Sequence, residues 1–293
     1  MFEGSLVAMV TPFDEQDRVD YEAVERLIEF HVRSGTDGLV IAGTTGESPT
    51  LRKDEHAELI RRAAGISAGR LPIIAGTGSN STSQTIELSL AVADAPIDAY
   101  LLVVPYYNKP VQEGLYRHFW AIADAVDKPV MLYNVPGRTV ADLLPETLAR
   151  LSLHPRIFGV KDATGNIGRL KACQELVEAD FCFYSGDDFT VLDFILEGGS
   201  GVVTVSGNVA PRLTASLCEA ALAGNAEAAR LIDERLQPLN KALFVESNPI
   251  PVKWALSEMD LIKPGIRLPL TPFAVEYHDQ MRSAMSLAGI GVE

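Results

Sequence analysis

Lys161 ends an apolar run that begins at residue 157, and it is the residue in this chain most informative about chemistry. If the run is a buried strand, the side chain lies where desolvation favours the neutral amine over the ammonium ion. A neutral lysine amine attacks ketones and forms a Schiff base. The local sequence also allows a lysine that extends to solvent or pairs with Asp162. Lys161 is therefore a candidate nucleophile, and its surroundings decide between these interpretations.

Two further candidates lie at the end of another apolar run, residues 129–133, and just beyond it. Tyr133 ends that run, and its phenol could carry a proton to and from an imine. The alternative is a core tyrosine whose hydroxyl is satisfied at the edge of the fold. Arg138 follows a Pro-Gly turn, where a guanidinium either binds a carboxylate through two parallel hydrogen bonds or lies exposed on a loop.

Polar loops follow two more runs. Gly43-Thr44-Thr45-Gly46 offers two hydroxyls and backbone N–H groups that can receive a carboxylate, although ordinary turns share this composition. Glu47 either orients this turn or caps the next helix. Tyr106-Tyr107 stand in a proline-bounded loop, a pattern typical of a core plug or of a contact between subunits.

Other chemistries lack their motifs. The five histidines show no HxH or HExxH spacing, so no metal site is predicted. Asp187-Asp188 could bind a cation, but helix N-capping explains them with fewer assumptions. Neither a Walker motif nor a Ser-His-Asp signature occurs. The motifs therefore favour lysine–imine chemistry.

These residues need a scaffold that gathers the ends of several apolar runs. Eight short runs rich in Val, Ile and Leu alternate with segments of helical periodicity, as parallel strands buried on both faces do. This pattern predicts an α/β fold, a (β/α)₈ TIM barrel, with its chemistry at the C-terminal ends of the strands. The expected strands are residues 6–10, 38–41, 72–75, 99–104, 129–133, 157–161, 181–185 and 201–205.

The rival to a barrel is an open, doubly wound sheet. Such a fold usually carries a glycine-rich fingerprint after its first strand, whereas Thr11-Pro12-Phe13 stand there in this chain. Helix start signals support the alternating pattern. Asp20 precedes a predicted helix over 21–33, Ser81 precedes one over 82–93, and Pro145 opens one over 146–152.

After the eighth run the pattern becomes purely helical. Residues 226–244, 252–257 and 272–287 are predicted helices, interrupted by Gly224-Asn225 and by the proline-rich segment 248–251. We therefore expect a catalytic barrel over residues 1–224 and a C-terminal helical domain over residues 225–293 that packs on it.

Composition limits the possible partners and location. The 293 residues carry a net charge of −14, which disfavours binding to nucleic acid. The apolar stretches are far shorter than the roughly 18 residues of a membrane helix. Glu3 and Pro12 do not fit a signal peptide. The three cysteines are an odd set without CxxC spacing, which suits a reducing compartment. We therefore expect a cytoplasmic protein that contacts no membrane.

Several motifs, in order along nearly the whole chain, resemble the dihydrodipicolinate synthase/N-acetylneuraminate lyase family, and the synthase branch is the closer match. The motifs are Val10-Thr11-Pro12-Phe13, Gly43-Thr44-Thr45-Gly46-Glu47-Ser48, Pro105-Tyr106-Tyr107-Asn108-Lys109-Pro110, Tyr133-Asn134-Val135-Pro136-Gly137-Arg138-Thr139, Gly159-Val160-Lys161-Asp162-Ala163-Thr164-Gly165 and Ser247-Asn248-Pro249-Ile250-Pro251-Val252-Lys253.

The resemblance implies class I aldolase-type chemistry without metal or organic cofactor. Lys161 would form an imine with pyruvate, and the derived enamine would attack L-aspartate 4-semialdehyde. Ring closure would release 4-hydroxy-tetrahydrodipicolinate, a precursor in lysine and diaminopimelate biosynthesis. By the same resemblance Thr44, Tyr107 and Tyr133 would relay protons, with Tyr107 reaching in from a neighbouring subunit. Substrate contacts would come from Thr45 to the pyruvate carboxylate, from Arg138 to the semialdehyde carboxylate, and from Val203.

The resemblance also implies an assembly and an effector. The active unit would be a homo-oligomer, most simply a tetramer of two tight dimers. L-lysine, the end product, would bind at the tight-dimer interface near Ser48, His56, Asn80, Gln84 and Tyr106. Two departures from lysine-sensitive relatives argue for weak inhibition: Gln84 replaces a glutamate and Lys53 replaces a histidine.

Two alternatives stay open at this stage. A sialic-acid or keto-sugar-acid aldolase would keep Lys161 and Tyr133 but tends to lack the arginine that stands here at 138. A non-catalytic barrel that binds a small acid as a regulator would bind ligand without turnover, and the presence of the lysine and all the relay residues argues against it.

Overall fold

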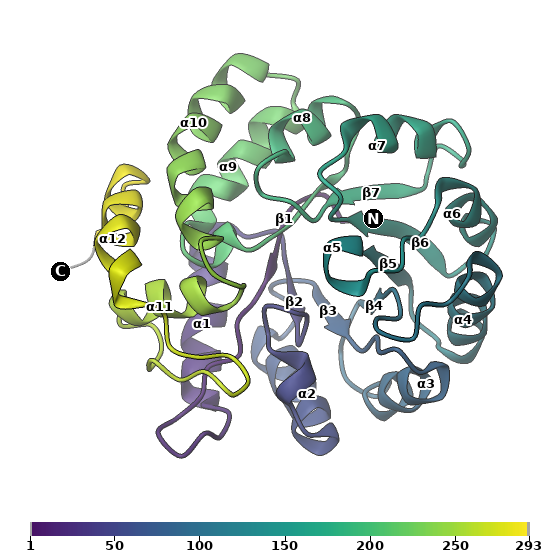
Figure 1. Ribbon diagram of the computed structural model, residues 1–293, viewed down its shortest axis with the longest axis horizontal. Helices are drawn as coiled ribbons and strands as arrows, with labels where there is room; N and C mark the ends of the chain where they lie inside the picture. Colours follow the sequence, from purple (N-terminus) through teal and green to yellow (C-terminus); the bar gives the residue numbers. More distant parts are fainter. Residues whose placement is uncertain (1, 292–293) are drawn as a thin grey trace.

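Eight parallel strands form a closed barrel in the computed structural model, which describes residues 2–291 (Figure 1). Consecutive strands are neighbours, and the eighth pairs with the first. The predicted barrel is thereby confirmed, and each predicted strand is found within two residues of its expected bounds. The strands are β1 Gly4–Ala8, β2 Gly38–Ile41, β3 Ile73–Gly76, β4 Ala99–Val103, β5 Val130–Asn134, β6 Ile157–Asp162, β7 Cys182–Ser185 and β8 Gly201–Thr204.

Both faces of the strands are buried, which explains why the strands are continuously apolar rather than alternating. Residues such as Leu6, Met131 and Tyr133 point into the barrel and form an inner core. Their strand neighbours, such as Val7 and Leu132, pack outward against the surrounding helices. A side chain at a strand end therefore projects either into the barrel mouth or back toward the helices.

Two of the helices around the barrel begin at capping residues that the sequence identified. Asp20 accepts a hydrogen bond from the Ala23 N–H at the start of the first helix, and Ser81 accepts one from the Gln84 N–H. The helices preceding the C-terminal region are α1 Tyr21–Ser34, α2 Lys53–Ser67, α3 Thr82–Ala91, α4 Gln112–Ala125, α5 Pro136–Thr139, α6 Pro145–Ser152, α7 Ile167–Gln174, α8 Val191–Leu196 and α9 Pro211–Leu222, with 3₁₀ turns η1 Ser48–Thr50 and η2 Ser206–Asn208.

The regular elements that the structure describes from Pro211 onward are helices, as predicted. Helices α10 (Ala226–Leu243), α11 (Ile250–Glu258) and α12 (His278–Leu287) follow α9, with η3 at Val275–Tyr277. In Figure 1, α10 lies between α9 and α12 on one flank of the barrel, and it contacts both. The turn between α9 and α10 contains the expected boundary at residue 224, and the division into two domains stays a prediction.

One predicted helix begins later than expected. The helical pattern of residues 272–287 forms a regular helix only from His278. Before it, the Ala274 N–H donates to the Glu246 carboxylate at 3.0 Å, and the Phe273 ring packs on Trp254. These contacts with other segments replace the helical hydrogen bonds at residues 272–274.

Among residues 2–291, no helix is long and apolar enough to cross a membrane. All three cysteines are free thiols, and Cys173 and Cys218 are buried.

Candidate active site

Lys161 and Tyr133 lie side by side in the barrel mouth. They are directly paired residues of the neighbouring strands β6 and β5, and both point inward. Their exposed fractions are only 7% and 6%. The Lys161 Nζ lies 4.2 Å from the centroid of the Tyr133 ring, over its face. The lysine therefore does not extend to solvent, and the expectation that both side chains reach one space is confirmed.

Gly186 leaves the room that Lys161 needs. A Cβ atom at this position would lie 2.9 Å from the Lys161 Cε and 2.8 Å from the Ala163 Cβ. Only glycine therefore fits beside the extended lysine at the end of β7. Sequence reasoning did not identify this position. Val203, on β8, is 1% exposed and belongs to the same inner core as Tyr133.

The threonine turn after β2 faces this space. Thr44 is half-buried and lines a cavity of about 30 Å³ together with Tyr133. Thr45 is buried, and its Oγ1 accepts a hydrogen bond from the Asn248 amide at 3.0 Å. The Thr11 hydroxyl donates to the Gly46 carbonyl at 2.6 Å and ties the turn to the end of β1. The turn is thus held from both sides.

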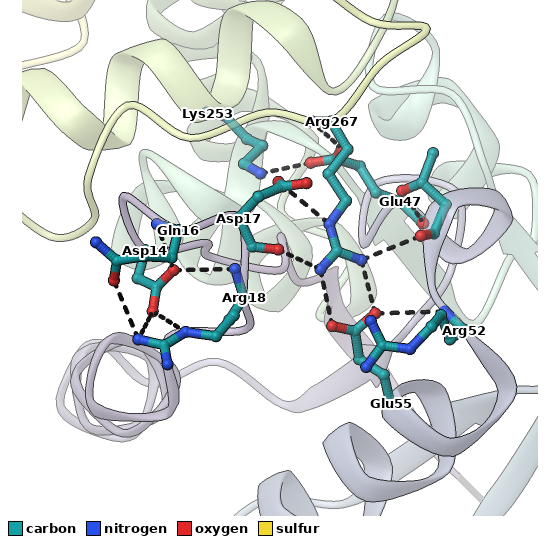
Figure 2. Close-up of polar contacts among 10 residues, drawn as sticks. Asp14, Gln16, Asp17, Arg18, Glu47, Arg52, Glu55, Lys253 and Arg267 are labelled. Atoms are coloured by element: carbon teal, nitrogen blue, oxygen red, sulfur yellow. Dashed lines mark hydrogen bonds and ion pairs between the residues drawn. The ribbon is translucent and has the colours of Figure 1, made fainter.

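Glu47 orients this turn through a buried ion pair, which settles the choice left open by the sequence. Its carboxylate pairs with the Lys253 ammonium and accepts the Arg267 backbone N–H at 3.1 Å (Figure 2). Burial lowers the pKa of Lys253 to about 8, and the Glu47 charge opposes that shift. The carboxylate caps no helix with its side chain.

Arg267 extends the same cluster toward α2 and the loop after β1. Its guanidinium donates to both oxygens of Glu55, at 2.6 and 2.7 Å, and to the Asp17 carbonyl at 2.6 Å (Figure 2). The guanidinium carbon lies 4.1 Å from the centroid of the Phe13 ring, and the Lys253 Nζ lies 4.2 Å from the same centroid. The segment after the barrel is therefore bound to the active-site turn by charge as well as by packing.

Arg138 lies exposed at the rim, on the short helix α5. Its Nη2 donates to the Asn248 carbonyl at 3.3 Å. It lines a cavity of about 300 Å³ that also includes Thr44. Asn248 thus contacts Arg138 through its backbone and Thr45 through its side chain. Sequence reasoning assigned no role to Asn248, Lys253 or Arg267; the signal available was a lysine within the apolar stretch around Val252 and Trp254.

Tyr107 does not approach Lys161 within its own chain. Its side chain is 89% exposed, which excludes a core plug, and its φ of 73° is strained for a residue of this size. Tyr106 is 37% exposed and lines the 300 Å³ cavity. The loop presents an aromatic ring to solvent and leaves the subunit-contact interpretation standing.

The positions expected to bind an effector divide into two groups. Ser48, His56 and Tyr106 line the 300 Å³ cavity. Burial lowers the pKa of His56, whose Nε2 lies 2.8 Å from the Gly76 carbonyl oxygen.

The other expected effector positions lie outside that lining. The Asn80 carbonyl accepts a hydrogen bond from the Asn108 amide at 2.8 Å. Gln84 is exposed on the first turn of α3. Lys53, the first residue of α2, pairs with Glu87 of α3 at 2.8 Å, so the two helices that flank this region are joined by an ion pair.

The Asp187-Asp188 pair does not cap α8, contrary to the sequence interpretation, because Thr190 is the capping residue. Asp188 is buried and accepts hydrogen bonds from the Thr204 hydroxyl and from the Val205 N–H, so it fastens the end of β8. Asp187 accepts the Thr190 hydroxyl at 2.7 Å. Within the part of the chain that the structure describes, no cluster of three or more His, Cys, Asp or Glu side chains could hold a metal ion.

Known proteins are similar to this chain in both sequence and fold. The model of the dihydrodipicolinate synthetase family matches residues 1–288. A protein of Pseudomonas savastanoi pv. phaseolicola, named 4-hydroxy-tetrahydrodipicolinate synthase, is 54% identical over 290 residues, which are 99% of either chain.

Solved structures agree with that match. The chloride-inhibited dihydrodipicolinate synthase of Acinetobacter baumannii, complexed with pyruvate, is 48% identical with a TM-score of 0.97, over 99% of this chain and 100% of that one. The enzyme of Cyanidioschyzon merolae with lysine bound is 41% identical with a TM-score of 0.96, over 99% of each chain.

Proposed function

The chain belongs to the dihydrodipicolinate synthetase family, and we propose that Lys161 is the residue through which it condenses pyruvate with L-aspartate 4-semialdehyde. The observation that carries the assignment is the buried Lys161 amine, which lies over the face of the Tyr133 ring at the C-terminal ends of the strands. In a barrel enzyme this is the end where catalysis takes place. The enzyme is a lyase.

The reaction proceeds through covalent intermediates on Lys161. The amine adds to the pyruvate ketone and expels water to give an imine, which loses a methyl proton and becomes an enamine. The enamine carbon attacks the aldehyde of the semialdehyde and forms the new carbon–carbon bond. The amino group of that substrate then displaces the Lys161 amine and closes the ring, giving 4-hydroxy-tetrahydrodipicolinate and free enzyme.

Tyr133 and Thr44 are the proton carriers in this proposal. Both line one small cavity, and the Tyr133 ring also contacts Lys161, so a phenol and a hydroxyl are available to pass protons to the carbinolamine and imine. Tyr107 of a neighbouring subunit completes the relay. Its 89% exposure supports this role, because a ring projecting from one chain is available to another. The proposed assembly is a tetramer of two tight dimers.

Two carboxylates need two binding sites. Thr45 and the backbone of its turn receive the pyruvate carboxylate, and Arg138 receives that of the semialdehyde through charge-assisted hydrogen bonds. Val203 contributes an apolar wall. Asn248 joins the two sites, since it contacts both Thr45 and Arg138. Local positive charge in the mouth of a protein of net charge −14 attracts the pyruvate anion and orients the carboxylate of the zwitterionic semialdehyde.

L-lysine is proposed as an effector that binds near Ser48, His56 and Tyr106, with Asn80 and Gln84 from the next element. Ser48, His56 and Tyr106 line the same cavity as Thr44, which supports a connection between the effector site and the substrate site. The uncharged Gln84 amide and the nearby Lys53 charge make the expected inhibition weak.

Borohydride trapping tests the central assignment. Incubation with pyruvate and borohydride should reduce the imine and attach a pyruvyl group to Lys161, which peptide mass spectrometry locates. Lys161→Arg keeps a positive charge and serves as the matched control without a nucleophile at neutral pH. A label on another lysine, or none in a protein that turns over substrate, contradicts the proposal. A parallel assay with N-acetylneuraminate separates the synthase from a sialic-acid aldolase.

Subunit mixing tests the shared relay. Tyr107→Phe and Lys161→Ala subunits are each expected to be inactive, whereas mixed dimers should regain one complete site. If subunits exchange and activity does not return, Tyr107 does not serve its neighbour.

A further inference from the structure

Arg169 touches none of the residues assigned to the reaction, and we infer that it positions three of them: Lys161, Tyr133 and Arg138. It is the third residue of α7, outside the barrel and behind the ends of β5 and β6. The inference rests on the proposed function, because it concerns the placement of the residues assigned there.

The guanidinium of Arg169 joins two carboxylates. Its Nε lies 2.8 Å from the Asp162 carboxylate, and its Nη1 donates to the Asp142 carboxylate at 3.0 Å. Its Nη2 donates to the Leu143 carbonyl. The Arg169 and Asp162 side chains are each 12% exposed, so their contact is largely protected from water, whereas Asp142 is 34% exposed. One planar group thus donates hydrogen bonds to two neighbouring residues, Asp142 and Leu143, and forms an ion pair with Asp162 at the end of β6.

The first connection leads to Lys161. Asp162 is the next residue in β6, and alternation along a strand turns its side chain outward while Lys161 points inward. The other carboxylate oxygen of Asp162 accepts the Thr164 N–H at 2.8 Å. Arg169 therefore fixes the strand end that carries the lysine.

The second connection leads to Tyr133 and Arg138. Asn134 follows Tyr133 in β5 and is paired in register with Asp162. Its amide donates to Asp142 at 2.8 Å and accepts the Leu143 N–H at 3.0 Å. These bonds close the loop between residues 134 and 142, which contains Arg138. By holding Asp142, Arg169 fixes the base of that loop and the strand end before it.

Loss of the cation has a predictable consequence. Without it, the Asp142 and Asp162 carboxylates lose the positive group that they share and repel each other, and Asp162 is left as a largely buried charge without its partner. The ends of β5 and β6 then separate. Displacements of about 1 Å at reacting groups lower rates by about 100-fold.

Arg169→Met removes the charge and keeps the bulk of the side chain. We expect the rate of pyruvate trapping at saturating pyruvate, and kcat, to fall about 10- to 100-fold, with a higher KM for the semialdehyde. Arg169→Lys restores one charged contact and should recover part of the loss. Arg150→Met is the matched control: Arg150 also links two barrel helices, through Glu113 at 3.0 Å, but lies 48% exposed and away from the strand ends.

Unchanged trapping and kcat in folded Arg169→Met, or a loss no greater than that of Arg150→Met, would overturn the inference. If Arg169→Met does not fold, Asp142→Asn decides: its single amide oxygen can still accept from Asn134, while its NH2 group faces the Arg169 Nη1 and removes the charged contact. It should raise the semialdehyde KM several-fold, and wild-type kinetics would overturn the inference. Absence of trapping at Lys161 in the wild-type protein would instead refute the proposed function.

Discussion

Lys253→Met should destabilise the protein by about 3–4 kcal/mol. Lys253 and Glu47 are 3% and 1% exposed, so water cannot replace the lost ammonium. Removing one partner of a buried pair typically costs about 3–5 kcal/mol. Uptake of a proton by the remaining carboxyl limits this cost, since neutralising an ordinary glutamate at pH 7 takes about 4 kcal/mol. The hydrogen bond that the Arg267 N–H donates to Glu47 slightly lowers the cost of leaving this carboxylate without its ammonium partner.

A second variant separates the charge effect from lost packing. The double variant Glu47→Gln/Lys253→Met contains neither charge, and its glutamine still accepts the Arg267 N–H. It should recover at least half of the stability lost by the single variant, because a neutral buried pair avoids the uncompensated carboxylate. Thermal unfolding at one protein concentration measures both. For the single variant we expect the midpoint to fall by about 6 °C.

The same variants test the link to the substrate. Glu47 holds the turn that carries Thr45, so Lys253→Met should raise the pyruvate KM more than it lowers kcat. A single variant as stable as the wild type, or a double variant no more stable than the single one, would refute the reasoning from buried charge.

Three further predictions follow from other positions. Gly186→Ala places a methyl group 2.9 Å from the Lys161 Cε and 2.8 Å from the Ala163 Cβ, so it should slow pyruvate trapping by at least about 10-fold and also lower thermal stability; an unchanged trapping rate contradicts this. Burial lowers the pKa of His31 from 6.5 to about 3, so the unfolded chain binds a proton there that the folded chain does not, and stability falls as the pH drops through this range. By about pH 4.5 this proton uptake should have lowered the free energy of unfolding by roughly 2–3 kcal/mol relative to neutral pH. His31→Gln should remove this loss, and parallel stability–pH curves for the two proteins would disprove the prediction. Gln84→Glu should lower the L-lysine concentration for half-inhibition about five-fold, and strong inhibition of the native enzyme or no change in the variant contradicts the effector proposal.

The fold was largely predictable because its signals are local. The apolar run before Lys161 and the capping residues Asp20 and Ser81 determine a strand and two helices within a few residues of themselves. The helix predicted from residue 272 failed for the opposite reason. Ala274 and Phe273 bind Glu246 and Trp254, and these contacts are invisible in a short window of sequence.

The site divides in the same way. Lys161 and Tyr133 could be proposed from strand ends alone, since the barrel geometry brings such ends together. Arg267 and Asn248 could not, because their partners Glu55 and Thr45 are 212 and 203 residues away in the chain. Gly186 is meaningful only once the path of the Lys161 side chain is known. Tyr107 could be assigned only by resemblance, because its expected partner belongs to another molecule.

The ion pair between Glu47 and Lys253 can form only late in translation, because its two partners are far apart in the chain. Glu47 leaves the ribosome 206 residues before Lys253, a delay of roughly 10 to 40 s at typical rates of translation. β1 and β2 precede Glu47, and the other six strands emerge in that interval, since β8 ends at Thr204. Throughout it the carboxylate that orients the threonine turn has no cation. A nascent or prematurely terminated chain can therefore contain every strand of the barrel and still have an unfinished substrate site, so activity appears only near the end of translation.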